Sequence, residues 1–210
     1  MAPTTRDAIL DGALEVMRTR GLAHATTKEI ARAAGFSEAT LYKLFADKTD
    51  LFICVLAERL PVVGVVSRDL TSLVRKGTVA ANLTMMVAEI ESFYEASLPI
   101  VMSLFSDVDL LARHREAVRA RGAGPEIIVR RVTEYLRAEQ AAGRVSSAAS
   151  ANGAAAALVG ACMQRAVLRC FDNLGSNQHV GSDLAAFAND VVAAIMHGLS
   201  TRPLRPVADY

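Results

Sequence analysis

The chain has 210 residues, of which 52% are hydrophobic and none is tryptophan, so a core of alanine, leucine and valine is expected. The 23 Lys and Arg residues nearly balance the 22 Asp and Glu residues, which argues against a protein that coats nucleic acid by bulk charge. The charged start lacks the apolar run of a signal peptide, and the longest apolar stretch, residues 154–163, is too short to span a membrane. Three cysteines without a Cys-x-x-Cys pair disfavour a disulfide framework, so a soluble, cytoplasmic protein is expected.

Apolar residues recur at helical spacing along nearly the whole chain, which predicts an all-α fold of about nine helices joined by short connectors. The first helix is expected to begin after Thr4, with Asp7 three residues later, and to end at Gly21. Breaks are expected at Pro61, Lys76-Gly77, Pro99, residues 122–125, Gly143 and residues 173–181. Later helices are marked by four stripes: Leu51, Phe52, Val55 and Leu56; Leu83, Met86, Val87, Ile90 and Tyr94; Ile128, Val132, Tyr135 and Leu136; and Leu184, Phe187, Val191, Ile195 and Leu199.

Residues 26–45, TTKEIARAAGFSEATLYKLF, predict two short helices joined by a tight turn. Thr26 can cap the first helix while Glu29 reaches back to it, and Ser37 can cap the second. Gly35 supplies a turn that would strain a bulkier residue. The inner face of the second helix is expected to consist of Leu41 with either Leu44 or Phe45.

The corner between these helices is expected to be filled by small and apolar side chains. Ile30 and Ala34 face inward, Ala31 is small where the helices cross, and Phe36 plugs the core beneath the turn. Helices this short have little stability of their own, which favours a rigid corner that presents the second helix. The outward residues of that helix are then Glu38, Ala39, Thr40, Tyr42 and Lys43.

The run T-x-x-x-I-A-x-x-A-G-F-S-x-x-T-L-Y-x-x-F-x-x-K resembles the signature of the TetR family of transcriptional regulators. The resemblance is specific over residues 1–56 and only architectural beyond them. It implies a homodimer whose two recognition helices enter successive major grooves of a pseudo-palindromic operator in duplex DNA. It also implies a helix-turn-helix DNA-binding domain (residues 1–47), a helical ligand-binding and dimerisation domain (48–200) and a loose tail (201–210). The matching letters are Thr26, Ile30, Ala31, Ala34, Gly35, Phe36, Ser37, Thr40, Leu41, Tyr42, Phe45 and Lys48.

Carried over by position, the phosphate contacts belong to Thr26, Thr40, Tyr42 and Lys48. Tyr42 has a hydroxyl donor, and Lys48 sits at a helix start where amide groups also favour phosphate. The base edges would be contacted by Glu38, Ala39 and Lys43, since Lys43 can donate to guanine and Ala39 can pack on a thymine methyl. Lys28 and Ser37 complete the predicted DNA-binding set.

Three features of the sequence disagree with an interface that has all the family's contacts or that binds DNA through positive charge alone. Leu44 stands where the family often has His or Tyr, so a polar contact there is absent or replaced. Glu38 is acidic beside a polyanion, so it either accepts from cytosine or is held away from the backbone. The acidic and basic residues of the segment are equal in number, and the lysines alone would be compatible with a solvated face.

The small-residue run at residues 146–162 and the last apolar stripe can form half of a four-helix bundle across a two-fold axis. An ordinary alanine-rich core helix is equally compatible with the run, and the family resemblance favours the dimer interface. The residues predicted for that interface are Leu158, Ala161, Leu184, Phe187, Val191 and Ile195.

Methionine and aromatic residues concentrate between residues 85 and 105 and occur again at Met163 and Phe171, and they can line a pocket for an apolar or amphipathic small molecule. The alternative is that they are simply core, and that Glu89, Glu91 and His114 face water rather than a ligand. The predicted pocket residues are Met86, Ile90, Phe93, Tyr94, Met102, Phe105 and Met163.

The four histidines are scattered and no cysteine lies at metal-ligand spacing, so neither a metal nor a cofactor is expected. Catalytic motifs are also missing, and an enzyme is not expected. The function predicted is a transcriptional repressor that a small-molecule ligand releases from its operator. Two alternatives stay open: a ligand-independent DNA-binding regulator, and a helical ligand-binding or interaction protein without DNA binding.

Overall fold

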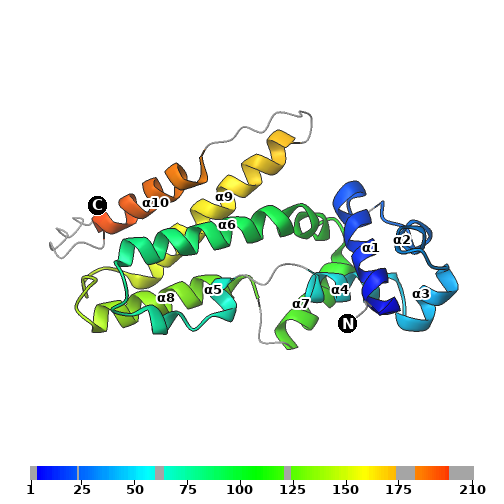
Figure 1. Ribbon diagram of the computed structural model, residues 1–210, viewed down its shortest axis with the longest axis horizontal. Coiled ribbons are helices and arrows are strands. Elements are labelled where there is room, and N and C mark those ends of the chain that lie inside the picture. Colours follow the sequence, from blue (N-terminus) through cyan, green and yellow to red (C-terminus); the bar gives the residue numbers. More distant parts are fainter. Residues whose placement is uncertain (1–3, 23, 60–63, 121–123, 174–182, 199–210) are drawn as a thin grey trace. The chain divides into compact units, whose positions relative to one another are not determined.

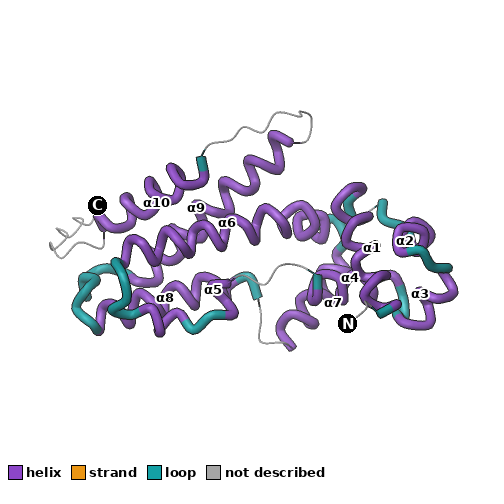
Figure 2. The backbone as a smooth tube through the Cα atoms, viewed as in Figure 1, coloured by secondary structure: helices purple, strands orange, loops and turns teal. Residues whose placement is uncertain are grey.

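The computed structural model describes residues 4–22, 24–59, 64–120, 124–173 and 183–198 (Figure 1). Within these ranges every regular element is helical (Figure 2), which confirms the predicted all-α fold. Nine of the α-helices described have seven or more residues, in agreement with the expected number. The elements are α1 (Thr5–Arg20), α2 (Thr27–Ala34), α3 (Glu38–Leu44), α4 (Lys48–Glu58), α5 (Gly64–Ser67), the 3-10 helix η1 (Leu70–Leu73), α6 (Val79–Leu104), α7 (Val108–Ala120), α8 (Glu126–Ala141), α9 (Ala151–Asn173) and α10 (Leu184–Gly198).

The chain forms two compact units, each assembled from two separate stretches of sequence. Unit 1 consists of Met1–Pro61 and Ala96–Gly124, and unit 2 consists of Val62–Glu95 and Pro125–Tyr210. Helix α6 therefore contributes its first part to unit 2 and its last part to unit 1. The predicted functional boundary after residue 47 is a different kind of division and stays a prediction.

Helix α1 begins and ends where the sequence predicts. Thr4 and Asp7 form a reciprocal capping box, and Gly21 terminates the helix with a φ of 73°, a value that favours glycine. Helix α2 crosses α1 closely, because a Cβ atom added to Gly12 would lie 2.9 Å from the backbone nitrogen of Ala34. The small residue that this crossing requires is therefore Gly12 of α1.

The hydrophobic core of unit 1 joins its two stretches of sequence. Ile9, Leu10 and Met17 of α1 and the complete predicted stripe of α4 are buried in it. The same core contains Ile100 and Leu104 from the end of α6 and Leu110 from α7. The first 61 residues alone therefore do not contain the whole core of their unit.

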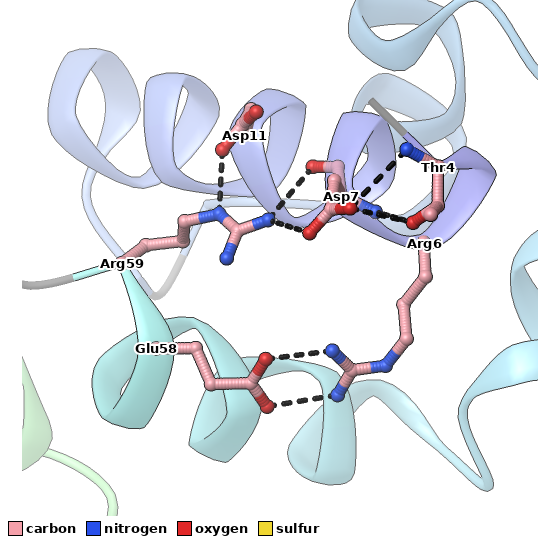
Figure 3. Close-up of polar contacts among 6 residues, drawn as sticks. All are labelled: Thr4, Arg6, Asp7, Asp11, Glu58 and Arg59. Carbon is pink, nitrogen blue, oxygen red and sulfur yellow. Dashed lines mark hydrogen bonds and ion pairs between the residues drawn. The ribbon is translucent and has the colours of Figure 1, made fainter. Parts of the chain in front are cut away.

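Ion pairs fasten the C-terminal end of α4 to α1 (Figure 3). Arg6 donates to both carboxylate oxygens of Glu58, at 2.6 and 2.8 Å. Arg59 donates from Nε to Asp11 and from Nη2 to Asp7, both at 2.6 Å. The hydroxyl of Thr4 and the Arg59 guanidinium lower the pKa of Asp7 to about 2. These contacts add a polar attachment to the apolar packing between α1 and α4.

In unit 2, the predicted stripes of α6 and α8 are buried throughout. Helix α9 packs against α8, and α10 runs back along α9 (Figure 1). Arg165 and Arg169 of α9 pair with Glu91 and Glu95 of α6, at 2.9 and 2.8 Å. Since both partners advance by four residues in the same direction, α6 and α9 run parallel there.

A second polar network in unit 2 joins the start of α6 to α8. Asn82 donates to the Tyr135 hydroxyl at 2.9 Å, and Tyr135 donates to Glu139 at the same distance. Arg144 lies 3.3 Å from the other oxygen of Glu139 and donates to the carbonyl of Gly77 at 2.8 Å. Burial raises the pKa of Tyr135 to about 12. The network pairs Tyr135 and one oxygen of Glu139, while Glu139 Oε2 has the ion pair with Arg144 but no hydrogen bond from a described residue.

The break expected at Pro99 is wrong, because α6 continues through this residue to Leu104. Proline has no N–H to donate to the preceding turn, so the helix loses one hydrogen bond there. The Pro99 side chain is exposed, while Leu98, Ile100 and Leu104 around it are buried. We attribute the continuity of the helix to the burial of these neighbours.

The last apolar stripe is less buried than its pattern suggests. Leu184 is exposed and Phe187 is half-buried, whereas Ala188 and Val192 are the buried residues of α10. Leu199, Pro61 and residues 174–181 lie outside the described residues. Thus the larger apolar side chains of α10 form a partly open face.

Helix α9 contains a longer apolar segment than residues 154–163 alone. By length and composition, Ala151–Asp172 is sufficient to cross a membrane. Its arginines pair with α6 and its body packs against α8 and α10, while 33% of its apolar window is buried.

Candidate nucleic-acid interface

Helices α2 and α3 meet at a corner whose caps are those predicted. The Thr26 hydroxyl accepts from the backbone nitrogen of Glu29 at 3.2 Å and donates to the Glu29 carboxylate at 2.9 Å. Gly35 adopts a left-handed conformation with a φ of 77°, and the Ser37 hydroxyl accepts from the backbone nitrogen of Thr40 at 3.2 Å. Each cap satisfies backbone groups that a short helix would otherwise leave unpaired.

The inner side of the corner is formed by Ile30, Leu41 and Phe45, which are all buried in unit 1. Leu44 is 42% exposed, so Phe45 is the partner of Leu41 on the inner face of α3. Phe36 is 38% exposed, and the expectation that it plugs the core is wrong. Its backbone nitrogen donates a 2.9 Å hydrogen bond to the Ala31 carbonyl.

The predicted DNA-binding residues lie on α2, α3, their N-caps and the start of α4, and all are at least partly accessible. Thr40 and Lys48 are half-buried, and the others are exposed. The Thr26 hydroxyl is already engaged in the α2 cap, and Thr40 shares a 2.9 Å hydrogen bond with Ser37. The residues are Thr26, Lys28, Ser37, Glu38, Ala39, Thr40, Tyr42, Lys43 and Lys48.

The acidic and basic residues of the helix-turn-helix segment are equal in number, but they differ in how many form ion pairs within the unit. Arg59 holds Asp7 and Asp11, while Glu29 is held by its cap and by Arg20. Asp47 caps α4 and pairs with Arg113 at 3.2 Å, which lowers its pKa. Lys28 and Lys43 are exposed and form no ion pair with any described residue. The acidic residues are thus largely neutralised within the unit, whereas lysines remain available on the α2–α3 surface. The ammonium group of Lys48 lies over the ring of Phe52, with its Nζ 5.1 Å from the ring centre.

Thr27, which was not among the predicted site residues, connects α2 to α3. Its hydroxyl donates to Glu38 Oε1 at 2.7 Å, and the Tyr42 hydroxyl donates to Thr27 Oγ1 at 3.4 Å. Glu38 is therefore held by a side chain of α2, and this contact leaves open whether it accepts from cytosine or is kept away from the DNA backbone. No local pattern indicates Thr27, because its contact with Glu38 depends on how the two helices cross.

The predicted pocket residues fall into different environments. Met86, Ile90 and Tyr94 are buried in unit 2, where Phe93 is half-buried and its ring centre lies 5.4 Å from that of Tyr94. Met163 is exposed in the same unit. The remaining two predicted residues, Met102 and Phe105, are exposed in unit 1. Among the described residues, the three buried residues and the half-buried Phe93 are the part of the predicted set that lies on one stretch of α6 within unit 2.

Each of the three charged residues that the sequence offered as ligand contacts has one buried polar atom without a hydrogen-bond partner among the described residues, although both glutamates also form an ion pair. Glu89 lies 2.9 Å from Arg68, and Glu91 pairs with Arg165. Burial lowers the pKa of His114 and raises the pKa of the Cys162 thiol to about 12. A thiol that resists ionisation is a poor nucleophile, so Cys162 belongs to the core.

The predicted dimer residues are also divided. Leu158 is buried within unit 2, Leu184 is exposed, and Ala161, Phe187, Val191 and Ile195 are half-buried. Leu158 is thus not on the surface, contrary to its assignment to the interface. A different set on α9 and at the start of α10 forms an exposed apolar face: Met163, Val167, Leu168, Phe171 and Leu184.

Comparisons with known proteins agree with this architecture. Residues 9–55 match the family model of bacterial regulatory proteins, tetR family. The HTH-type transcriptional regulator SrpR of Pseudomonas putida is 41% identical over 58 residues, which are 28% of this chain and only 27% of the relative. The family model is thus matched over residues 9–55 alone, and the match to this relative covers only about a quarter of either chain.

Solved structures are similar over nearly the whole chain. A putative TetR-family transcriptional regulator from Mesorhizobium loti has a TM-score of 0.72 at 21% identity, covering 92% of this chain and 95% of that one. The transcriptional regulator FadR from Bacillus subtilis, in complex with stearoyl-CoA, has a TM-score of 0.65 at 18% identity, with 92% and 98% coverage. At these identities the likeness shows the fold alone.

Proposed function

We propose that the chain is a regulator of the tetR family type and binds DNA in a sequence-specific way, because its helix-turn-helix region matches the family model of bacterial regulatory proteins. The observation that carries the proposal is the exposed side of α3. Ala39, Tyr42 and Lys43 lie on the accessible surface while Leu41 anchors the helix in the core. A two-turn helix fixed in this way is suited to enter a major groove.

The binding we propose depends on few, placed contacts rather than on bulk charge. Tyr42, Thr40, Thr26 and Lys48 contact phosphates and set the position of the protein on the duplex. Base edges are contacted by Glu38, Ala39 and Lys43, with Lys28 and Ser37 beside them. The availability of the lysines and the internal pairing of the acidic residues support this arrangement.

We place the dimer interface on the exposed apolar face of α9 and α10. An apolar face of this kind on a soluble protein calls for a partner. The same helix exposes Gly153, Ala156, Ala157 and Gly160, which would let a second copy approach closely. Two copies related by a two-fold axis would place two recognition helices on half-sites about 34–36 Å apart. The operator would accordingly be pseudo-palindromic.

We further propose that the protein is a repressor released by an apolar or amphipathic small molecule. The proposed pocket lies along α6 near Met86, Ile90, Phe93 and Tyr94, in the domain that we assign to residues 48–200. The stearoyl-CoA bound by the structurally similar FadR supports a ligand of this kind. Ligand binding would favour a dimer with altered spacing between the recognition helices, and so weaken operator binding. As a regulator of its own genome, the protein would act in the cytoplasm and catalyse no reaction.

The test is binding of the full chain to fluorescent duplexes from the DNA upstream of its own gene, measured by anisotropy. A duplex that is bound in the presence of excess unrelated DNA supports the proposal. If the chain binds no sequence, even in a selection from random duplexes, the proposal is wrong. The alternative that then remains is a helical ligand-binding or interaction protein without DNA binding. Compounds that raise the melting temperature are then added to the complex, and retained operator binding with all of them would indicate ligand-independent regulation.

A further inference from the structure

The first residue of α3 has a side chain whose direction is set by α2. Thr27 Oγ1 lies 2.7 Å from Glu38 Oε1, across the turn of the helix-turn-helix. A carboxylate only accepts hydrogen bonds, so the single proton of the Thr27 hydroxyl is used in this bond. Tyr42 must then be the donor in its own 3.4 Å contact with Thr27. The proton order Tyr42 to Thr27 to Glu38 follows from the chemistry of the three groups.

The two hydrogen bonds of this series differ in length and strength. The contact of Tyr42 is long and can be exchanged for a phosphate oxygen, whereas the bond between Thr27 and Glu38 is short and involves a charged acceptor. Oε1 is thereby committed to α2. Oε2 has no hydrogen-bond partner among the described residues, and Glu38 is exposed on the face of α3. Glu38 thus presents one free acceptor oxygen in a fixed position.

A fixed acceptor discriminates between bases in the major groove. Guanine presents only acceptors there, and thymine presents an acceptor and a methyl group, so neither can bond to Oε2. Adenine offers its N6 amino group, but the N7 acceptor beside it repels a carboxylate. Cytosine offers its N4 amino group without a neighbouring acceptor. The base that suits Glu38 is cytosine.

We propose that Thr27 is the positioning residue of Glu38 and that the pair makes one position of each operator half-site selective for cytosine. This inference rests on the proposed function, because it requires α3 to enter the major groove. Without the Thr27 hydroxyl, the Glu38 side chain regains its rotamers and must be ordered when DNA binds. Its discrimination between bases is then expected to weaken by about tenfold.

The test is a selection of bound duplexes from a randomised library with the full chain, followed by sequencing. The unaltered protein should enrich cytosine at one position of each half-site. Glu38→Ala should lose that preference and keep the others. Thr27→Val, which has the same shape without the hydroxyl, should weaken it, and Thr27→Ser should restore it. Melting curves check that each variant is folded.

The outcomes separate this inference from the proposed function. If the unaltered protein enriches no sequence, DNA recognition itself fails and the inference fails with it. If it enriches a motif whose preferences are the same in Glu38→Ala, only the inference is overturned. A uniform loss of affinity in Thr27→Val, with the cytosine preference unchanged, would show that Thr27 contacts phosphate or supports the fold and does not position Glu38.

Discussion

Arg165 donates a hydrogen bond to Glu91 at 2.9 Å, and both side chains are buried in unit 2. Burial raises the pKa of the Glu91 carboxyl, while the guanidinium opposes that rise. The carbon centre of the same guanidinium lies 4.8 Å from the centre of the Phe187 ring. Arg165 therefore connects the helix of the proposed pocket, α6, with α9 and α10 of the proposed dimer interface.

Replacing Glu91 by alanine should destabilise the protein strongly, because it deprives a buried guanidinium of its carboxylate. We expect the free energy of unfolding to fall by about 3–5 kcal/mol, as measured by urea denaturation. The matched control is Glu95→Ala, which breaks the more exposed pair with Arg169 one helical turn away. That change should cost no more than about 1 kcal/mol, and equal losses in both variants would contradict the distinction.

Because of the ion pair between Asp7 and Arg59, the free energy of unfolding should depend on pH in the acidic range. The pKa of Asp7 is lowered from 3.8 to about 2 in the folded protein, so the folded state holds this proton less tightly than the unfolded state does. Its contribution is present above pH 3.8 and is lost as the pH falls towards 2. Urea titrations at several pH values should show the difference between the unaltered protein and Asp7→Asn shrinking over this interval. A constant difference would exclude such linkage.

Variants of α3 and α4 should separate phosphate contacts from base contacts. Lys48→Ala removes a phosphate contact, so it should weaken binding to all duplexes about equally and reduce the salt slope by about one for each protomer. Tyr42→Ala should likewise lower affinity uniformly. Lys43→Ala should instead change which sequences are preferred. Anisotropy titrations with a panel of operator variants at several salt concentrations measure both effects, and unchanged preference in Lys43→Ala would remove this residue from the base contacts.

An acidic residue in the exposed face of α9 should prevent dimerisation. Phe171 is 75% exposed, so Phe171→Glu costs the folded chain little, but it would bury a charge between two copies. Sedimentation velocity should show a monomer at micromolar concentration, with a corresponding loss of operator affinity. Phe105→Glu is the control, since Phe105 is 66% exposed and lies in unit 1, outside the proposed interface. Dissociation of the control alone, or of neither variant, would contradict the assignment.

Features that depend on a few neighbouring residues were accessible from the sequence. The caps at Thr4, Thr26 and Ser37 each involve residues three positions apart, and Gly35 is required by a local backbone conformation. The stripes of α4, α6 and α8 could be recognised because helical periodicity alone decides which residues turn inward.

Features that depend on packing between distant segments could not be predicted in the same way. Continuation of α6 through Pro99 requires buried neighbours on both sides of it, and the choice between Leu44 and Phe45 depends on where the core of unit 1 lies. Thr27 and Glu38 meet because two helices cross, and Arg165 finds Glu91 across a long interval of sequence. Exposure on α9 and α10 likewise follows from their neighbours rather than from their own patterns.

The core of unit 1 comes from two separate stretches of sequence, so it cannot be completed until both have been synthesised. The helices of the proposed DNA-binding surface are synthesised before Ile100, Leu104 and Leu110 of their core, which follow only after the beginning of unit 2. Until then, apolar side chains of α1 and α4 remain open to water and to other nascent chains. The support of the proposed DNA-binding surface is thus complete only after Leu110 has been translated, and a fragment that stops after α4 would carry the proposed binding residues on an incomplete core.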